Sequence, residues 1–516
     1  MSHESTGVPC RSARLTARVR PGGRRRLPLA VGGVALVAAV GVAGAPASAA
    51  GGPSPGPVMA AKPGSWIALS PTSGIPEAGT PAVWENAAGD AWVLWQRPAG
   101  PDKTYEVAEV GPTGRLVNKP TDIFAGHHWG SLTGQPTLVG QGAKPLVVFD
   151  GLSGVPGPYN DGCIYGALSG ATPWVLQSWS LSNNCTNPVG GATEGTSGTL
   201  AAAWPGGWST GHGVLYRVGV SSSIPASGAD QHIPLSGPAT AFKTGVASDV
   251  SGKGHFDVAW TRGFSTPARG DGFYVKDVTA GTAAMKAPGT GTNSVNHMSG
   301  FGNLAIANTN THAGVFIAYC SNRSTCTVQL WRVGAKRAIG VPHSKGGANP
   351  AVSAGPAGRL WVAWYNESTN KVSVTRTNKR DTHFGPVRTY PTHCAEHGLV
   401  GLSGGKSGRL DVALQCVNSA KLQLEDFATQ VMVPLSLTPG RTSVRNTKAH
   451  HLTFTVTDAG DPVPRARVFV AGHRARTNAA GKATITLARG VKPGHYRVKA
   501  TARGYRPAGG RLTVSH

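Results

Sequence analysis

Three carboxylates fall at one place in an internal repeat of the sequence, and facing carboxylates can act as acid and base. Glu85 and Glu194 each lie ten residues before a repeated aromatic residue, and Asp249 lies eleven before one. Glycoside hydrolysis uses two such carboxyl groups, roughly 5–9.5 Å apart. All three positions are close to predicted turns between strands, where a solvated acid needs no chemical role. The sequence therefore gives Glu85, Glu194 and Asp249 as candidate catalytic residues, with turn solvation as the alternative.

The longer segments between predicted strands carry aromatic and histidine side chains that are suited to ligand binding, for example by stacking on sugar rings. These candidates are His127, His128, Trp129, Tyr159 and Trp174. The same side chains can instead pack the loops against the domain, and both alternatives stay open.

Two short motifs match patterns of hydrolases, but their surroundings do not fit. Residues 393–397 spell HxxEH, which binds zinc when both histidines share one face of a helix. Pro391 and Gly398 bound this motif and predict a loop instead. Residues 401–405 spell GxSxG, whose serine acts at a turn from strand to helix, and a chain with 72 Gly is expected to contain a chance match. We therefore expect no metal site and no cofactor.

The elements that must position these residues belong to a pattern that recurs seven times between residues 81 and 414. Each unit has an apolar run, a turn that contains Gly, and a second apolar run that ends in a large side chain. The terminal residues are 45 to 59 residues apart: Trp95, Phe149, Trp204, Trp260, Tyr319, Trp364 and Leu414. Two further strand-length runs follow each motif, and four short strands per unit of about 50 residues are typical of a propeller blade. The repeats predict a seven-bladed β-propeller over residues 65–431, with a string of independent sandwiches as the alternative.

The composition agrees with an all-β chain. Of 516 residues, 72 are Gly and 38 are Pro, and only 14% are charged. Gly and Pro break helices, which excludes a helical bundle. Gly does not recur at every third residue, which excludes collagen. An apolar share of 40% with 13 Trp excludes general disorder.

The seventh unit supplies only three strands before the chain leaves the repeats. The run SWIALS at residues 65–70 precedes the first unit and has no unit of its own. We expect this run to form the outer strand of the last blade and so to join the two ends of the ring.

Residues 1–49 are typical of an export signal that is removed from the mature protein. Seven Arg precede residue 27, an apolar stretch rich in Ala, Val and Gly follows, and Ala47-Ser48-Ala49 matches a cleavage site. The Arg24-Arg25-Arg26-Leu27 run resembles a twin-arginine signal, while a general secretory signal and an uncleaved anchor are the alternatives. Residues 50–64 predict a flexible linker, and we expect no transmembrane segment after cleavage.

The cysteines agree with export, because an even number in an exported chain indicates disulfides. Six remain beyond the signal, and proximity in sequence favours the pairs Cys163–Cys185, Cys320–Cys326 and Cys394–Cys416. No Cys or His spacing indicates zinc.

On its repeats, the segment from about residue 65 to residue 431 resembles secreted bacterial propellers of the sialidase-like and BNR-repeat group. The Asp-box of that group, Ser-x-Asp-x-Gly-x-Thr-Trp, is absent. The resemblance implies a ring of blades with ligand sites on its loops.

The last residues, 432–516, predict a small β-sandwich. Polar and apolar residues alternate at residues 453–456 and again at residues 495–500, which is typical of half-buried strands. The Thr477-Asn478-Ala479-Ala480-Gly481 turn, the later Pro493-Gly494 and the Gly504-Tyr505 pair make this segment resemble a carboxypeptidase-regulatory-like or Ig-like sandwich. The resemblance implies a non-catalytic accessory domain.

The positive charge of the chain is concentrated in this sandwich. Residues 433–516 contain 15 Lys and Arg but only two acidic residues. Their net charge is therefore +13, out of +25 for the whole chain. Such a surface outside the cell attracts polyanions, above all anionic wall polymers. A solvated surface without a partner is the alternative, and nothing resembles a nucleic-acid recognition module.

These observations together predict a secreted, cell-surface or wall-associated bacterial protein that binds rather than catalyses. Its propeller loops would hold a glycan or an extracellular protein, and its sandwich would attract an anionic wall or matrix. The alternative function is that of a carbohydrate-active enzyme, a glycoside hydrolase or lyase with acids at the mouth of the propeller channel.

Overall fold

The structure of the protein is a computed structural model. It describes residues 66–71, 79–99, 102–125, 129, 131–132, 135–141, 144–149, 151–152, 164–168, 174–180, 191–194, 198–205, 213–220, 230–235, 240–248, 254–263, 268–295, 304–309, 314–322, 326–392, 394, 396–404, 408–418 and 423–516. The predicted signal peptide and linker lie outside these residues. Among them we find no α-helix, so no described helix is long or apolar enough to cross a membrane.

Within the described residues, the strands up to Pro434 form seven antiparallel sheets of four strands, which we number as blades 1 to 7. Blades 1 to 4 are β2 (Ala82–Glu85), β3 (Ala91–Ala99), β4 (Asp102–Val110) and β5 (Thr121–Asp122); β7 (Thr137–Gln141), β8 (Lys144–Phe149), β10 (Ile164–Leu168) and β11 (Val175–Ser180); β12 (Gly191–Glu194), β13 (Leu200–Pro205), β14 (Val214–Val220) and β15 (Gln231–Ile233); and β16 (Thr240–Ser248), β17 (Phe256–Gly263), β18 (Gly272–Asp277) and β19 (Met285–Lys286). Blades 5 to 7 are β20 (Leu304–Asn308), β21 (Val315–Cys320), β22 (Val328–Arg332) and β23 (Ile339–Gly340); β24 (Gly347–Ala354), β25 (Leu360–Asn366), β26 (Lys371–Arg376) and β27 (Arg388–Pro391); and β28 (Glu396–Ser403), β29 (Arg409–Asn418), β30 (Gln423–Pro434) and β1 (Ile67–Pro71). Short pieces β6 (Ser131–Leu132) and β9 (Gly151–Leu152) pair with each other.

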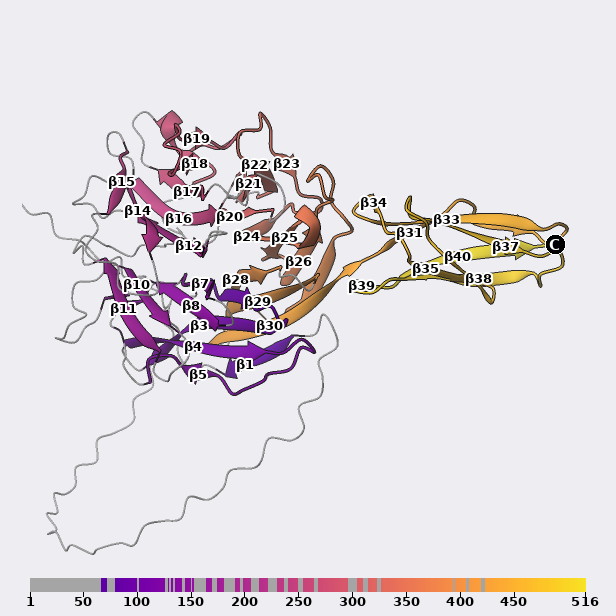
Figure 1. Cartoon of the computed structure of the whole chain (residues 1–516), viewed down its shortest axis with the longest axis horizontal. Coiled ribbons are helices and arrows are strands. Elements are labelled where there is room, and N and C mark those ends of the chain that lie inside the picture. Colours follow the sequence, from indigo (N-terminus) through magenta and orange to yellow (C-terminus); the bar gives the residue numbers. More distant parts are fainter. Residues whose placement is uncertain are drawn as a thin grey trace, which may run out of the picture. The chain divides into compact units, whose positions relative to one another are not determined.

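The first strands of the blades form a closed ring. β2, β7, β12, β16, β20, β24 and β28 contact one another in that order, and β28 contacts β2 (Figure 1). A ring of four-stranded sheets around a shared centre is a β-propeller. The prediction of an all-β propeller is confirmed.

The ring is closed by a strand from the beginning of the described chain. β1 pairs antiparallel with β30, with Ile67 opposite Ala428, and it is the outermost strand of blade 7. The prediction for residues 65–70 is therefore confirmed. Blade 7 contains strands from both ends of the repeat region, so opening the ring requires the hydrogen bonds between β1 and β30 to break.

The second strand of each blade is apolar because other blades cover both of its faces. Every residue of β13 is buried. Its residues alternate in direction: Leu200, Ala202 and Trp204 pack in a cluster with blade 2, while Ala201 and Ala203 pack in a cluster with blade 4. The seven residues that end the repeated motif are each at most 2% exposed. They form the core between blades, as their recurrence predicts.

Two glycines allow the first strands to approach closely near the centre of the ring. A Cβ on Gly191 of β12 would lie 2.7 Å from Cα of Gly245 in β16. A Cβ on Gly245 would in turn lie 2.7 Å from Cγ2 of Ile306 in β20. Any larger residue at either position would push neighbouring blades apart.

Two of the three predicted disulfides lie in the described residues, and both have the predicted partners. Cys320 bonds Cys326 and Cys394 bonds Cys416, with Cα–Cα distances of 5.0 and 5.6 Å. The pair expected at residues 163 and 185 lies outside the described residues.

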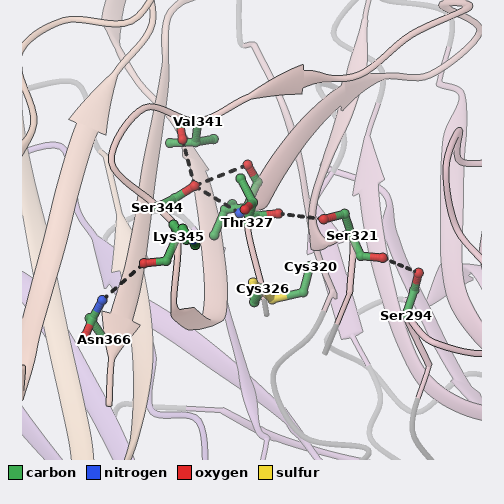
Figure 2. Close-up of a disulfide and its surroundings, with 10 residues drawn as sticks. Ser294, Cys320, Ser321, Cys326, Thr327, Val341, Ser344, Lys345 and Asn366 are labelled. Carbon is green, nitrogen blue, oxygen red and sulfur yellow. Dashed lines mark hydrogen bonds between the residues drawn. A yellow bond between two sulfur atoms is a disulfide. The ribbon is translucent and has the colours of Figure 1, made fainter. Parts of the chain in front are cut away.

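The loop closed by Cys320 and Cys326 is bonded to its neighbours, as Figure 2 shows. Ser294, in the segment after blade 4, donates its hydroxyl to the carbonyl of Ser321 at 2.6 Å, and Ser321 donates to the carbonyl of Thr327 at 3.3 Å. The amide of Asn366, at the end of β25 in blade 6, donates to the carbonyl of Lys345 at 3.5 Å. This part of the ring is therefore tied across blades by hydrogen bonds as well as by packing.

The C-terminal strands form two further sheets that share one core, the arrangement of a β-sandwich. The four-strand sheet contains β31 (Ser436–Pro439), β33 (His450–Asp458), β34 (Asp461–Pro462) and β37 (Lys482–Leu487). The five-strand sheet contains, in spatial order, β32 (Ser443–Arg445), β40 (Ala508–Ser515), β38 (Gly494–Thr501), β35 (Arg467–Val470) and β36 (His473–Arg476). Phe454 and Ile485 from the first sheet pack with Val468, Val498 and Leu512 from the second.

Candidate functional site

The predicted carboxylates occupy equivalent places in the ring. Glu85 is the last residue of β2 and Glu194 is the last residue of β12, the first strands of blades 1 and 3. The shared spacing to the repeated aromatic thus places them at one position of the blade. Asp249 and the side chain of Glu194 lie outside the described residues, so Glu85 is the carboxylate whose surroundings can be followed.

Glu85 lies where blade 1 meets blade 7. Its backbone N–H donates to Oγ of Ser403 at 3.1 Å, and Ser403 ends β28 directly opposite Asp411 of β29. A Cβ on Gly89 would lie 3.8 Å from Oε1 of Glu85 and 3.7 Å from Nη1 of Arg409. The Glu85 carboxylate and the Arg409 guanidinium therefore approach the same point in the turn after β2.

Asp411 and Arg409 form an ion pair at this junction. Arg409 Nε donates to both carboxylate oxygens of Asp411, at 3.1 and 3.2 Å, and the Asp411 side chain is only 4% exposed. Burial raises the pKa of the Asp411 carboxyl to about 7, because the loss of water outweighs the attraction of Arg409, and the nearby Glu85 carboxylate adds to the rise. Asp411 can therefore hold a proton near neutral pH.

Arg409 also connects the two blades. Its guanidinium donates to the carbonyl of Pro112 at 3.2 Å and to the carbonyl of Gly89, and both carbonyls belong to blade 1 turns. Asp411 thus orients an arginine that reaches across the closure of the ring. A buried carboxyl that is occupied in this way is suited to fix the junction rather than to reach a substrate.

A second pair of acids, Asp90 and Glu109, lies in blade 1 itself. The Asp90 N–H donates to Oδ1 of Asn86 at 2.9 Å, and the Asn86 amide donates back to Oδ2 of Asp90 at 3.1 Å. Burial, together with the Asp90 carboxylate, raises the pKa of Glu109. The Asn86–Asp90 bonds close the turn after Glu85, which agrees with the turn alternative for this region.

The aromatic candidates that the structure describes are core residues. Trp129 is 0% exposed, with its ring centre 5.5 Å from those of Phe124 and Phe149. Its backbone N–H and carbonyl are hydrogen-bonded to the backbone of Lys103. Trp174 is 7% exposed and meets Trp92 edge to face at 6.3 Å. In both residues the ring packs the loops, and neither presents an open face to a ligand.

The remaining ligand candidates, His127, His128 and Tyr159, lie outside the described residues. The structure therefore leaves them as predictions.

Neither hydrolase motif has the local structure that its chemistry needs. Residues 396–397 of the HxxEH pattern begin β28, a strand, and Cys394 within the pattern is bonded to Cys416. Ser403 of the GxSxG pattern ends β28, and the next described element is the strand β29 rather than a helix. No group of metal-binding side chains occurs among the residues that the structure describes.

The C-terminal sandwich has two outward faces of very different charge. On the five-strand sheet, the outward side chains include seven cations, which we call the cationic face: Arg445, Arg467, Arg474, Arg476, Arg497, Lys499 and Arg511. On the four-strand sheet, the outward positions of β33 and β37 carry His451, Thr453, Lys482, Thr484 and Thr486. Among the strands of the two sheets, the cations are therefore concentrated on the outward face of the five-strand sheet.

The two carboxylate side chains of residues 433–516 are used by the propeller. Asp458 is 1% exposed and pairs with Arg376 of β26 and, at 3.2 Å, with Arg359. Asp461 pairs with Arg359 at 2.6 Å and accepts the N–H of Lys379 at 2.8 Å. Neither acid remains to neutralise the cationic face.

Sequence reasoning predicted the charge of the sandwich but missed its sidedness and missed Asp411. The signal for the first lies in the alternation of His495, Arg497 and Lys499 with apolar residues, which places all three on one face. The signal for the second is a carboxylate inside the apolar run of residues 410–414 in the second strand of blade 7.

Comparisons with known proteins give similarity at the level of structure alone. No protein-family model and no curated protein matches the chain. Among solved structures, the chain is similar to the polysaccharide lyase Uly1 (12% identity, TM-score 0.43, 72% of this chain and 94% of that chain). It is also similar to an α-L-arabinanase of Penicillium chrysogenum (12% identity, TM-score 0.39, 71% of this chain and 98% of that chain). A third similar structure is the SapL1 lectin (12% identity, TM-score 0.37, 62% of this chain and 97% of that chain).

Proposed function

We propose that this protein is an exported binding protein that is held at an anionic cell wall or matrix by its C-terminal sandwich. The propeller would bind a glycan or an extracellular protein through its loops. The observation that carries the proposal is the uncompensated charge of the sandwich, which has 15 Lys and Arg against two Asp. Asp458 is bonded to Arg359 and Arg376 of the propeller, and Asp461 is bonded to Arg359.

Because both acids are paired with arginines of the propeller, the positive electrostatic potential outside the sandwich is stronger. A buried carboxylate that is paired with arginine contributes little to the potential at a distant surface, because the pair is nearly neutral. The other cations of the domain then act together on the solvent side, where a surface of one sign attracts polyanions and speeds their association. The two disulfides support a location outside the reducing cytoplasm.

The test of this proposal is co-sedimentation of the mature protein with purified cell walls that retain or lack their anionic polymers. We expect binding at low salt that weakens as salt is added, because salt screens exposed charges. Equal binding to walls stripped of anionic polymers would contradict the proposal. Deletion of residues 433–516 is a poor test, because it would leave Arg359 and Arg376 without their carboxylates.

The alternative function, a glycoside hydrolase or lyase, has one specific observation in its favour. Asp411 has a pKa near 7 beside the Glu85 carboxylate, and unequal acids in one site are the basis of general acid–base catalysis. Glu85→Gln combined with Glu194→Gln separates the two functions. Turnover of a glycan by the unaltered protein that is lost in the double variant, with glycan binding retained, would support the enzyme. Glycan binding without turnover in both proteins supports the binding protein.

A further inference from the structure

We infer that the cationic face of the five-strand sheet is a binding site for a linear glycan-type polymer that carries repeated oxyanion groups, such as phosphate or sulfate. This inference rests on the proposed function and deepens it, since it assigns the attraction to seven residues on one face.

The register places the cations side by side across the strands. Arg497 of β38 is directly opposite Arg511 of β40. Arg467 of β35 is directly opposite Arg476 of β36. Such pairs have Cβ atoms about 4.5–5.5 Å apart. The face therefore brings guanidinium groups together in pairs instead of interleaving them with acids.

Lys499 joins these pairs into one stripe. It is opposite Phe469 of β35, and Phe469 is opposite Arg474 of β36, so a partly buried ring separates two cations in one row. Arg445 of β32 lies beside Ser515 at the other edge of the sheet. Same-face residues along a strand are about 6.8 Å apart and neighbouring strands are about 4.8 Å apart, so Arg476 and Arg445 are offset by about 27 Å along the strands and about 19 Å across them.

Like charges that face each other across a sheet are destabilising. The two Asp of residues 433–516 do not relieve this repulsion, because Asp458 and Asp461 are held by Arg359 and Arg376. The opposite face of the same sandwich shows that such crowding is not needed for the fold, since Thr453 is opposite Thr484 there. An anionic ligand on the cationic face would remove the repulsion.

The residue types and the shape of the face indicate the ligand class. Six of the seven cations are arginine, whose planar guanidinium binds two oxygens of phosphate, sulfate or carboxylate at once. An exposed stripe of this length matches an extended chain with several charges better than a single small anion. Residues 433–516 contain no helix that could enter a groove of duplex DNA, which favours a flexible glycan-type polymer.

The test measures the affinity of the full mature chain for a linear polyol phosphate and for a sulfated linear glycan, with uncharged dextran and a short DNA duplex beside them. The variant is Arg497→Gln with Arg511→Gln. The matched control is Lys482→Gln with Arg489→Gln, which removes the same charge from exposed positions off the cationic face. All three proteins are first compared by thermal unfolding.

We expect the Arg497/Arg511 variant to bind the anionic polymer about tenfold to a hundredfold more weakly, because two charge-assisted contacts are lost. The control should lose less than threefold, and dextran should not bind. The difference between polyol phosphate and sulfated glycan identifies which oxyanion the face prefers.

Three outcomes would overturn the inference, and they are distinguishable. If both variants weaken equally, the charge acts without a defined site, so the proposed function stands and the inference fails. If the unaltered protein binds neither anionic polymer, the proposed function fails as well. If duplex DNA binds as tightly through the same two arginines, the assignment to a glycan-type polymer is wrong.

Discussion

Asp411 is a carboxylic acid at the closure of the ring, where burial opposes its ionisation while Arg409 supports it. Burial has the larger effect and raises its pKa to about 7. The groups that face it are Arg409, Glu85 and Gln430. Asp411 ionises more readily in the unfolded chain than in the folded protein, so its charge state is linked to the stability of the ring.

Replacement of Asp411 by Asn should therefore flatten the pH dependence of stability. The folded state holds the Asp411 proton more tightly, so this group makes the free energy of unfolding fall as pH rises from about 4 to about 7, by an amount on the order of a few kcal/mol. Urea unfolding at pH 4.5, 6 and 8 measures the slope. The same slope in Asp411→Asn and in the unaltered protein would show that another group is responsible.

Trp129 shows how burial decides between the two interpretations of an aromatic residue. It is fully buried against Phe124 and Phe149. Trp129→Ala should lower the free energy of unfolding by about 3–5 kcal/mol, as expected for a large core side chain. A stable Trp129→Ala protein with weakened glycan binding would contradict this account and restore the residue as a ligand contact.

At the scale of the elements, each disulfide restrains a different length of chain. Cys320 and Cys326 close a separation of six residues, and Cys394 and Cys416 close one of 22. The entropy that a cross-link removes from the unfolded chain grows with the length of the loop. The second disulfide should therefore contribute more to stability than the first.

Replacement of both cysteines by Ser should lower stability by about 2 kcal/mol at Cys320–Cys326 and by about 3 kcal/mol at Cys394–Cys416. Chemical unfolding of the two double variants without reductant measures the difference. A larger loss at the shorter loop would mean that native contacts around Cys320, rather than chain entropy, dominate.

The five-strand sheet places Arg497 directly opposite Arg511, and the repulsion between these like charges lowers its stability. Removal of the Arg497–Arg511 repulsion by Arg497→Gln with Arg511→Gln should leave the midpoint of thermal unfolding unchanged or raise it slightly, even though binding is weakened. The control pair at Lys482 and Arg489 should leave it unchanged. A marked loss of stability in the Arg497/Arg511 variant would show that these arginines support the fold rather than a ligand.

At the scale of the whole molecule, the propeller and the sandwich share buried ion pairs. Arg376 and Arg359 are 4% and 5% exposed, and Asp458 serves both of them. The Arg376 guanidinium also lies 5.1 Å from the Trp361 ring and 6.0 Å from that of Tyr505. Removal of the Asp458 carboxylate would therefore take an ion-pair partner from both buried guanidinium groups.

Asp458→Ala should lower stability by about 3–5 kcal/mol, the usual effect of breaking a buried ion pair from one side. Asp461→Ala should have a smaller effect because Asp461 is 19% exposed. Thermal unfolding of both variants tests the difference. Equal and small effects would show that the junction depends on the pairing of β30 with β39 (Tyr505–Arg506) instead.

Local patterns in the sequence predicted the strands, the ring and its closure, because a buried strand between blades must be apolar and must end in a side chain that fills the gap. The run at residues 65–70 could be placed in blade 7 because blade 7 lacked a fourth strand. The site was harder to predict, since Glu85 meets Arg409 and Asp411 only after the two ends of the repeat region join. The ion pairs of Asp458 with Arg359 and Arg376 link residues about 80–100 apart in sequence, and nothing in either segment indicates the other.

The salt dependence of polymer binding is the sharpest test of whether the cationic face holds an anionic polymer. For the unaltered protein and a linear polyol phosphate, the logarithm of the binding constant should fall linearly with the logarithm of salt concentration, because bound cations release counterions. In Arg497→Gln with Arg511→Gln the slope should be smaller by roughly 1–2, about one for each lost contact. An unchanged slope, or binding that does not respond to salt, would contradict the claim that the cationic face holds the polymer.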